Sequence, residues 1–437
     1  MKSLTKLFKI IALGALVTSF AGCNPREDDD IITPPTGGTE TISGSISTNT
    51  TWTAGNKYLL SGFVYVESGA TLTIEAGTII KGDRATKGSL IIKRGAKLIA
   101  VGTQDKPIVF TSNQPVGQRA AGDWGGVVLL GKAPVNKTPA VIEGENITEF
   151  GGNDPADNSG ILKYVRIEFA GIAFETDKEI NGLTFGGVGT GTQVDYVQVS
   201  NSGDDSFEWF GGTVNAKHLI SYRGLDDDFD TDNGYSGTVQ YGLIIRDPNV
   251  ADQAGDSNAF ESDNDASGSE ATPKTAAKFA NITATIASGD LNSKYRSAMR
   301  LRRSTELSIY NSVFTAAYPR GIELQDKVAD NYKAGKLKIE GVIVQGAITP
   351  LVGVDQAIFE AAGNKNKLYA TVAELVLDAN FNSLNVRPVL VPKAGSPLLS
   401  GGATLPSGFE ATAYRGAFGG SDWTSGWANF DPQNTAY

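Results

Sequence analysis

Residues 69–103 read GATLTIEAGTIIKGDRATKGSLIIKRGAKLIAVGT. Two parts of this segment match: residues 69–78 begin Gly-Ala-Thr-Leu, residues 95–103 begin Gly-Ala-Lys-Leu, and both end in Gly-Thr. The β-favouring runs between the glycines are too short for a helix. A repeat period in the twenties with short strands is typical of a solenoid, in which each coil buries its apolar face only by stacking on its neighbours.

Two interleaved series of short apolar runs extend this pattern along the chain. The first series comprises residues 162–167, 194–199, 218–221, 243–245, 281–283, 311–314 and 341–344. The second comprises residues 183–185, 207–209, 229–231, 260–262, 299–301 and 322–324. Two series that advance together indicate faces of one coil. We therefore predict an all-β fold, a right-handed parallel β-helix; the competing interpretation, a β-sandwich or propeller, requires tight hairpin dipeptides that are scarce here.

The overall composition limits the class of function. The chain has 437 residues, 52 glycines, one histidine and a formal net charge of -10. Phosphate contacts need clustered lysine and arginine, and an acidic chain without a basic stripe is a poor nucleic-acid binder. We therefore predict no nucleic-acid partner.

The N-terminus indicates export. Three lysines precede an apolar run at residues 10–20, which is too short to span a bilayer and is typical of a secretory signal over residues 1–22. The following Ala21-Gly22-Cys23 resembles the bacterial lipobox, whose cysteine is diacylated and becomes the new N-terminus, although Phe20 replaces the usual aliphatic residue. Cys23 is the only cysteine, so an intramolecular disulfide is excluded. We predict lipidation at Cys23; the alternative is an ordinary signal peptide with an incidental cysteine.

The rest of the chain divides into three parts. Residues 23–40 hold an acidic run and a stretch rich in Pro, Gly and Thr, which indicates a tether. The acidic run resembles the surface-export signal of Bacteroidota lipoproteins, and the alternative is a solvated linker. We expect the β-helix over residues 41–400, with a short helix near 371–379 that starts at a capping box, and a cap over the last coil at residues 401–437.

Four longer motifs carry a family resemblance. They are Gly-Asp-Trp-Gly-Gly at 122–126, GDDSFEWFGG at 203–212, LDDDFDTDNG at 225–234 and Tyr-Arg-Gly-Ala-Phe at 414–418, the last followed by Gly426-Trp427. These motifs are similar to those of a Bacteroidota family of β-helix surface lipoproteins, and the likeness covers most of residues 41–432. The resemblance implies a lipid-anchored β-helix on the outer membrane, exposed at the cell surface. It implies no activity.

The second series predicts a stripe of charged side chains. If its first apolar residues point inward, the next residues point outward and stack into a column: Glu208, Asp230, Glu261, Arg300 and Glu323. Two residues further on, a second column comprises Phe210, Asp232, Asp263, Arg302 and Gln325. The preceding turns add Asp204, Asp205, Asp226, Asp227 and Asp228. Carboxylates this close repel one another and need a compensating cation or raised pKa values.

Two kinds of compensation are open. The arginines of the following coil can pair with the carboxylates in a structural ladder; they are Arg296, Arg300, Arg302 and Arg303. Alternatively a hard cation such as Ca²⁺ takes the oxygens of Asp226, Asp228, Asp230 and Asp232, with Asp204 or Glu208 as a further ligand. The alternate spacing resembles a calcium loop, but Val239 stands at the twelfth position, so this is not an EF-hand.

Two classes of function remain. The first is a non-catalytic scaffold that binds a glycan or an outer-membrane protein and that calcium stabilises if the second kind of compensation holds. Its ligand-binding residues are Asp204, Glu208, Phe210, Glu261, Asp263, Arg300 and Arg302, and Phe210 is the expected exposed aromatic for sugar contact. The second is a carbohydrate-active enzyme: a calcium-dependent polysaccharide lyase with Arg300 or Arg302 as base, or a glycosidase that uses aspartate pairs. Because the flanking residues match no such signature, we assign no catalytic residue, and we expect the sole histidine, His218, to be a rung residue.

Overall fold

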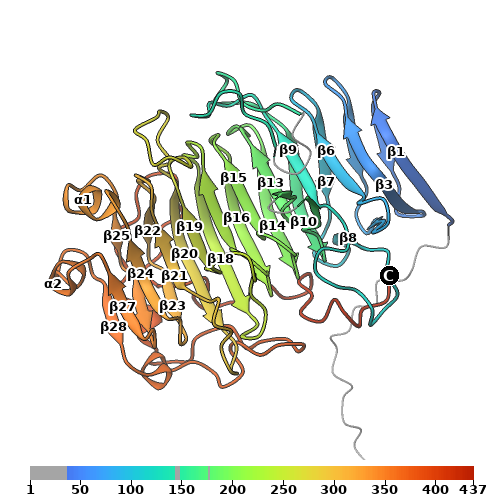
Figure 1. Ribbon diagram of the computed structural model, residues 1–437. Coiled ribbons are helices and arrows are strands. Elements are labelled where there is room, and N and C mark those ends of the chain that lie inside the picture. Colours follow the sequence, from blue (N-terminus) through green and yellow to red (C-terminus); the bar gives the residue numbers. More distant parts are fainter. Residues whose placement is uncertain (1–36, 143–147, 176–177) are drawn as a thin grey trace, which may run out of the picture. The chain divides into compact units, whose positions relative to one another are not determined.

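The computed structural model describes residues 37–142, 148–175 and 178–437, and all structural statements below concern these residues. The predicted signal segment and Cys23 lie outside them. Within residues 37–437 the chain winds as one stacked coil from β1 to β28, and the C-terminal segment returns toward the first strands (Figure 1). No helix in the described ranges is long and apolar enough to cross a membrane.

The strands are short. The first are β1 (Thr39–Ile46), β2 (Thr50–Trp52), β3 (Lys57–Val66), β4 (Thr71–Ile74), β5 (Ile79–Gly82), β6 (Ser89–Ile92), β7 (Lys97–Val101), β8 (Ile108–Ser112) and β9 (Val127–Leu130). The middle strands are β10 (Gly160–Glu168), β11 (Ala173–Glu175), β12 (Lys178–Glu179), β13 (Leu183–Gly186), β14 (Gln193–Ser200), β15 (Phe207–Phe210), β16 (Asn215–Tyr222), β17 (Phe229–Asp232), β18 (Thr238–Arg246) and β19 (Phe260–Ser262).

The last strands are β20 (Lys278–Ile286), β21 (Ser297–Leu301), β22 (Ser308–Tyr310), β23 (Val313–Thr315), β24 (Arg320–Leu324), β25 (Ile339–Glu340), β26 (Ile343–Gln345), β27 (Thr349–Val352) and β28 (Lys367–Tyr369). The helices are α1 (Val328–Lys333), α2 (Gln356–Phe359) and the 3₁₀ turns η1 (Val372–Leu375) and η2 (Pro397–Leu399). The predicted capping box joins Thr371 and Glu374, but it opens a 3₁₀ turn shorter than the helix expected there.

Strand pairing forms three parallel sheets around a right-handed β-helix, as predicted. Sheet A contains β4, β7, the first parts of β10, β14, β16, β18 and β20, and then β22 and β25. Sheet B contains β5, β8, the second parts of the same long strands, and then β23, β26 and β28. Sheet C contains β6, β9, β13, β15, β17, β19, β21, β24 and β27.

Sheets A and B are separated by a bend in the long strands that the sequence pattern did not reveal. Each long strand passes from sheet A to sheet B at one residue with left-handed φ, namely Tyr164, Tyr196, His218, Tyr241 and Asn281 in successive coils. Side chains other than glycine are strained in this conformation. The rings of Tyr196 and Tyr241 stack on either side of His218 at 4.2 and 4.9 Å, which offsets that strain. His218 is therefore a rung residue, as expected.

Residues 401–437, which we call the strap, do not cap the last coil as predicted. They lie along the outward face of sheet B, where Phe418, Trp427 and Phe430 cover Ile220, Tyr222 and Leu243. Hydrogen bonds join Asn429 to Gln198 in the middle of the coil, and Lys57 to Tyr437 near its start. The last coil is covered instead by the segments of α1 and α2, whose Val328 and Phe359 belong to the core (Figure 1). The strap leaves the outward face of sheet C to other side chains.

Candidate functional site on sheet C

The outward column of sheet C has the predicted register. Glu208 pairs with Asp230, Asp230 with Glu261, Glu261 with Arg300, and Arg300 with Glu323. The residues before them, among them Phe207, Phe229 and Phe260, are fully buried in the core. Alternation along each strand therefore turns the charged side chains outward, and stacking makes neighbours of carboxylates that are far apart in the chain.

A second row of carboxylates and amides lies in the turns just before these strands. The Oδ1 atom of Asp205 accepts a hydrogen bond from the Asp227 backbone amide at 2.8 Å, and Asp227 accepts one from the Asn258 amide at 2.6 Å. Asn258 continues the row by accepting from the Ser297 amide at 3.0 Å. We call this row the turn ladder. It fixes the position of Asp205 and Asp227, because each side chain holds the backbone of the next rung.

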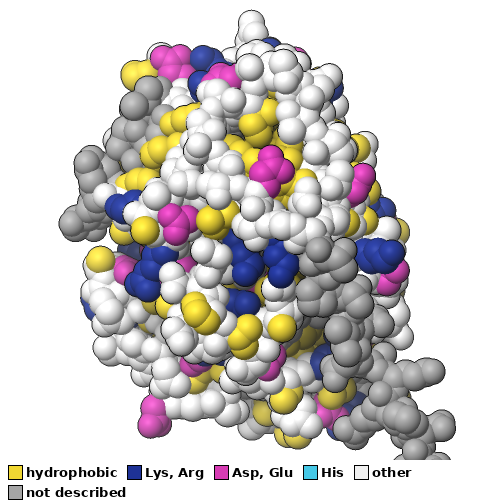
Figure 2. Space-filling view, turned by 90° about the vertical axis from the view of Figure 1, so that its right-hand side faces the viewer, with side chains coloured by type: hydrophobic (Ala, Val, Ile, Leu, Met, Phe, Trp, Pro, Cys, Tyr) yellow, Lys and Arg dark blue, Asp and Glu magenta, His cyan; other side chains and the backbone are white. Residues whose placement is uncertain are grey.

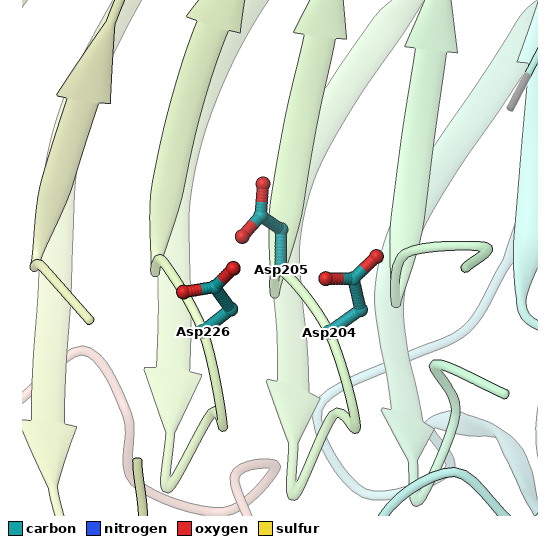
Figure 3. Close-up of side chains that lie close together, drawn as sticks. All are labelled: Asp204, Asp205 and Asp226. Atoms are coloured by element: carbon teal, nitrogen blue, oxygen red, sulfur yellow. The ribbon is translucent and has the colours of Figure 1, made fainter. Parts of the chain in front are cut away.

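The turn ladder and the column bring carboxylates together in two overlapping groups. Carboxylate oxygens of Asp204, Asp205 and Asp226 lie within 4.8 Å of one another, and so do those of Asp205, Glu208 and Asp230. Figure 3 shows the carboxyl groups of Asp204 and Asp226 on either side of Asp205. Calcium binds oxygen at about 2.3–2.6 Å, so oxygens that share one ion lie within about 5 Å of each other. Both groups meet this limit, and Asp205 belongs to both.

The described residues provide no ion pair to Asp205, Asp226, Asp227 or Asp230. The Oδ1 atoms of Asp226 and Asp230 are buried without a hydrogen-bond partner. Burial, followed by repulsion from Asp252 and Glu261, raises the pKa of Asp226 to about 7. Burial and the neighbouring carboxylates also raise the pKa values of Asp205, Asp227 and Asp230 well above the ordinary range. Within the described part of the chain, these four carboxyl groups therefore have no paired cation to offset their charge.

The other half of the stripe carries its own cations. Arg300 pairs with Glu261 at 3.2 Å, and Arg302 and Arg303 pair with Asp263 at 2.8 and 2.7 Å. Burial opposes the charge on Arg302, but Glu261 and Asp263 raise its pKa above the ordinary value. Arg296, just before β21, reaches the next rung and forms a two-pronged pair with Glu323 there at 3.0 Å. This half is the arginine ladder that the sequence offered as an alternative to calcium.

Two of the residues assigned from the sequence do not face the site. Asp228 is fully buried inside the coil, where it pairs with Arg246 at 2.7 Å and accepts from Ser221 at 2.5 Å. Phe210 is also buried: it packs against Phe150 in a cluster outside sheet C and offers no exposed ring for a sugar. The predictions of Asp228 as a metal ligand and of Phe210 as a sugar platform are therefore wrong.

Asp232 lies on the stripe but outside both carboxylate groups. Its Oδ1 atom accepts from the Asn233 amide at 2.5 Å. Burial raises the pKa of Asp232 to about 7; the Asn233 amide opposes this shift, and Asp263 adds to it. The structure thus brings Asp226 and Asp230 together with Asp204 and Glu208, and leaves the other two aspartates of the predicted metal site aside.

The sequence also missed the residue at the centre. Asp205 was not among the predicted ligands, although it belongs to both groups. The signal was present: Asn181, Asp205, Asp227 and Asn258 each stand two residues before the inward apolar residue of their strand. Asn181 donates to Glu208, so this row touches the column as well. A search for polar residues repeated at that position would have found the turn ladder.

Comparison with known proteins supports the fold. The sequence profile of the family described as a pectate-lyase-like β-helix domain matches residues 44–384. Comparison with curated proteins and with solved structures found no significant match. The match spans most of the chain and coincides with the coil that carries the carboxylate stripe. The chain therefore belongs to the pectate-lyase-like β-helix family.

Proposed function

We propose that this protein is an exported, lipid-anchored β-helix that binds an acidic glycan through calcium held on the outward face of sheet C, without cleaving it. The observation that carries the proposal is the pair of carboxylate groups that share Asp205, together with the absence of an ion pair to Asp205, Asp226 or Asp230 among the described residues. An acidic glycan would be repelled by bare carboxylates. A divalent cation removes that repulsion and offers the glycan a ligand site.

The residues present fit calcium. The donors are all carboxylate oxygens, which hard cations prefer, and two of them, Oδ1 of Asp226 and Oδ1 of Asp230, are buried without a partner. Asp204, Asp205 and Glu208 complete the set that would hold the ion. When bound, calcium supplies positive charge that can be shared between protein and glycan carboxylates. The turn ladder keeps Asp205 in place with or without the ion, because its Oδ1 atom holds the Asp227 amide.

The arginines support binding over cleavage. A lyase base must be deprotonated when it takes the proton from the sugar ring. Arg302 is locked between Glu261 and Asp263, and its pKa is raised rather than lowered. Arg300, Arg302 and Arg303 form ion pairs with Glu261 and Asp263 beside the carboxylate groups. These paired side chains can orient a bound glycan chain. We assign no catalytic residue.

The location rests on the N-terminal sequence. The lipobox-like Ala21-Gly22-Cys23 and the acidic run after it support a lipid anchor at Cys23 in the outer membrane, with the protein facing the cell surface, as in the Bacteroidota lipoproteins that the chain resembles. A lipid anchor at Cys23 on the cell surface would make the stripe available to glycans outside the cell. An outer-membrane protein partner is compatible with the same arrangement.

A second candidate function is a calcium-dependent polysaccharide lyase. The family description names pectate lyases, which act on an acidic polysaccharide. Arg300 favours this candidate more than Arg302 does, because its buried Nε atom has no hydrogen-bond partner while its Nη1 atom pairs with Glu261 and Asp256. In that case Arg300 would take the proton and calcium would hold the sugar carboxylate.

One experiment separates these candidates. The full chain with Cys23→Ser is titrated calorimetrically with polygalacturonate and with alginate, in calcium and in EDTA, and new unsaturated ends are followed by ultraviolet absorbance. We expect calcium-dependent binding and no new absorbance. Asp205→Asn should abolish binding, whereas the exposed Asp290→Asn should not. Product formation that is lost in Arg300→Lys would establish the lyase, and binding that is equal in EDTA would refute the calcium-dependent site.

A further inference from the structure

A second built site lies on sheet B, apart from the carboxylate stripe, and it is filled by the last residue of the strap. The hydroxyl of Tyr437 donates to the Oε1 atom of Glu168 at 2.5 Å and accepts from the Asn429 side chain at 3.1 Å. The ring packs on Ile79 and Val109, and only 8% of the residue is exposed. Tyr437 is thus held by two hydrogen bonds at its hydroxyl and by apolar packing of its ring.

Two arginines complete the walls of this site. The guanidinium carbons of Arg119 and Arg166 lie 5.1 and 5.8 Å from the centre of the Tyr437 ring, within range of cation–π attraction. Both arginines are nearly buried, at 5% and 6% exposure. Arg119 also donates to the backbone oxygens of Pro432 and Thr435 at 2.8 and 3.0 Å, so it holds the end of the strap as well as the ring.

The charges around the site are unusual for a protein core. Lys57 donates to the Tyr437 backbone oxygen at 2.9 Å, and burial followed by repulsion from Lys57 and Arg119 lowers the pKa of Lys81. The Nε and Nη2 atoms of Arg166 are buried without hydrogen-bond partners. Figure 2 views the side of the molecule with the first strands and the C-terminus, where Lys and Arg side chains gather near the centre beside hydrophobic ones. Cations therefore surround an apolar slot that ends in one buried carboxyl group.

This chemistry selects a phenol. An apolar ring satisfies Ile79 and Val109, and its face attracts the two guanidinium groups. At the end of the slot, Glu168 is 1% exposed and its other oxygen accepts from Thr111, so buried Oε1 favours a ring whose hydroxyl donates to it, as that of Tyr437 does. A phenylalanine ring would leave that oxygen unsatisfied, and an aliphatic side chain would lose the cation–π contacts.

We propose that sheet B carries a binding site for a 4-hydroxyphenyl group, which Tyr437 fills in cis, and that filling this site closes residues 431–437 over the first coils. The apolar walls and the carboxyl group of the site come from β5, β8 and β10, and the loop of Arg119 adds a cation that the strap carbonyl groups hold. Emptying the site would uncover Ile79, Val109 and the cations. The strap end is then a latch on a site whose apolar walls belong to the coil.

The test is chemical rescue in the full chain carrying Tyr437→Ala. Hydrogen exchange of the amides in residues 108–118 and 429–437 reports whether the latch is closed. We expect Tyr437→Ala to speed this exchange at least about tenfold, a factor equivalent to about 1.4 kcal/mol, and 4-methylphenol to restore slow exchange. Toluene, which has the same ring without the hydroxyl, should be at least about tenfold weaker. Asn434→Ala serves as the matched control in the strap, because its side chain is exposed and donates to Asp431 within the strap.

Two further variants keep the proposal open to refutation. Tyr437→Phe should speed exchange in the same residues. Glu168→Leu, which removes both acceptor oxygens, should abolish the preference for 4-methylphenol over toluene when combined with Tyr437→Ala. Equal rescue by both compounds, or exchange in Tyr437→Phe as slow as in the wild type, would overturn the proposal. If Tyr437→Ala does not fold, the Tyr437→Phe comparison still decides whether the hydroxyl closes the latch.

Discussion

The Oδ1 atom of Asp205 accepts a hydrogen bond of 2.8 Å from the backbone amide of Asp227, one rung further along the coil. One oxygen of Asp205 is therefore committed to the fold, while the carboxyl group as a whole belongs to both carboxylate groups of the stripe. An asparagine at this position keeps an oxygen for the Asp227 amide and removes the charge. The structural and the ionic role of Asp205 can thus be separated by one substitution.

The first prediction uses that substitution. In the wild type, millimolar calcium should raise the melting temperature relative to EDTA, because an ion that binds only the native state adds about 2.7 kcal/mol at a hundred times its Kd. Asp205→Asn should lose most of this increase and should melt higher than the wild type in EDTA, because one repelling charge is gone. Differential scanning calorimetry of both proteins, with Asp290→Asn as control, tests this. An unchanged calcium response in Asp205→Asn would show that the ion binds elsewhere.

The second prediction concerns acid stability. Burial disfavours the charge on Glu323, but hydrogen bonds from Arg296, Ser297 and Gln325 prevail and lower its pKa to about 2. A carboxyl group with a lowered folded-state pKa contributes stability that is complete above its unfolded pKa and is lost as pH falls from about 4.5 to about 2. For a shift of this size the loss is about 3 kcal/mol. Urea unfolding at several pH values should show it in the wild type and a flatter profile in Glu323→Gln; equal slopes would contradict the assignment.

A third prediction addresses the ion pair inside the coil. Arg246 and Asp228 are fully buried and paired at 2.7 Å, and Arg246 also donates to the backbone oxygens of Gly224, Leu225 and Asp226. Arg246→Met should cost about 3–5 kcal/mol in the free energy of unfolding, since it leaves a buried carboxylate alone. Adding Asp228→Asn should recover part of that loss. Denaturant unfolding of both variants checks this, and a double variant weaker than the single one would contradict it.

The fourth prediction concerns location. If Cys23 is the lipid site, the wild-type protein should fractionate with outer membranes and be accessible to protease added to whole cells. Cys23→Ser should release it into the soluble fraction, because a single signal-derived segment without lipid provides no stable anchor. Metabolic labelling with a fatty-acid analogue gives a direct readout. Labelling that persists in Cys23→Ser would place the lipid on another residue.

The sequence predicted the column of sheet C because its physical cause is local. Glu208 follows an inward Phe207 and Asp230 follows an inward Phe229, so alternation alone places both outward. In the turns this rule fails, because the alternation of a strand does not continue there. Asp226 reached the site, whereas Asp228 turned into the coil to meet Arg246.

The other misses depend on long-range packing. Phe210 has an outward position on its strand, but Phe150 from a distant loop covers it. The strap looked like a cap because its tryptophans lie near the end of the sequence. Its position became clear only from contacts such as that between Asn429 and Gln198, which no local pattern encodes. The fold and the column of sheet C were therefore predictable from the sequence. Which segments cover the outward faces of the sheets was not.

The register of sheet C also determines which side chains become neighbours when a whole coil is deleted or inserted. Removing residues 207–228 would join two equivalent corners and let Phe229 stack where Phe207 now lies, so the winding would survive. Asp230 would then neighbour Thr184, and Glu208, Asp226 and Asp227 would be gone. The proposed ion site thus depends on the order in which the coils are stacked, and a shortened or lengthened descendant can keep its architecture while losing the carboxylates of that site.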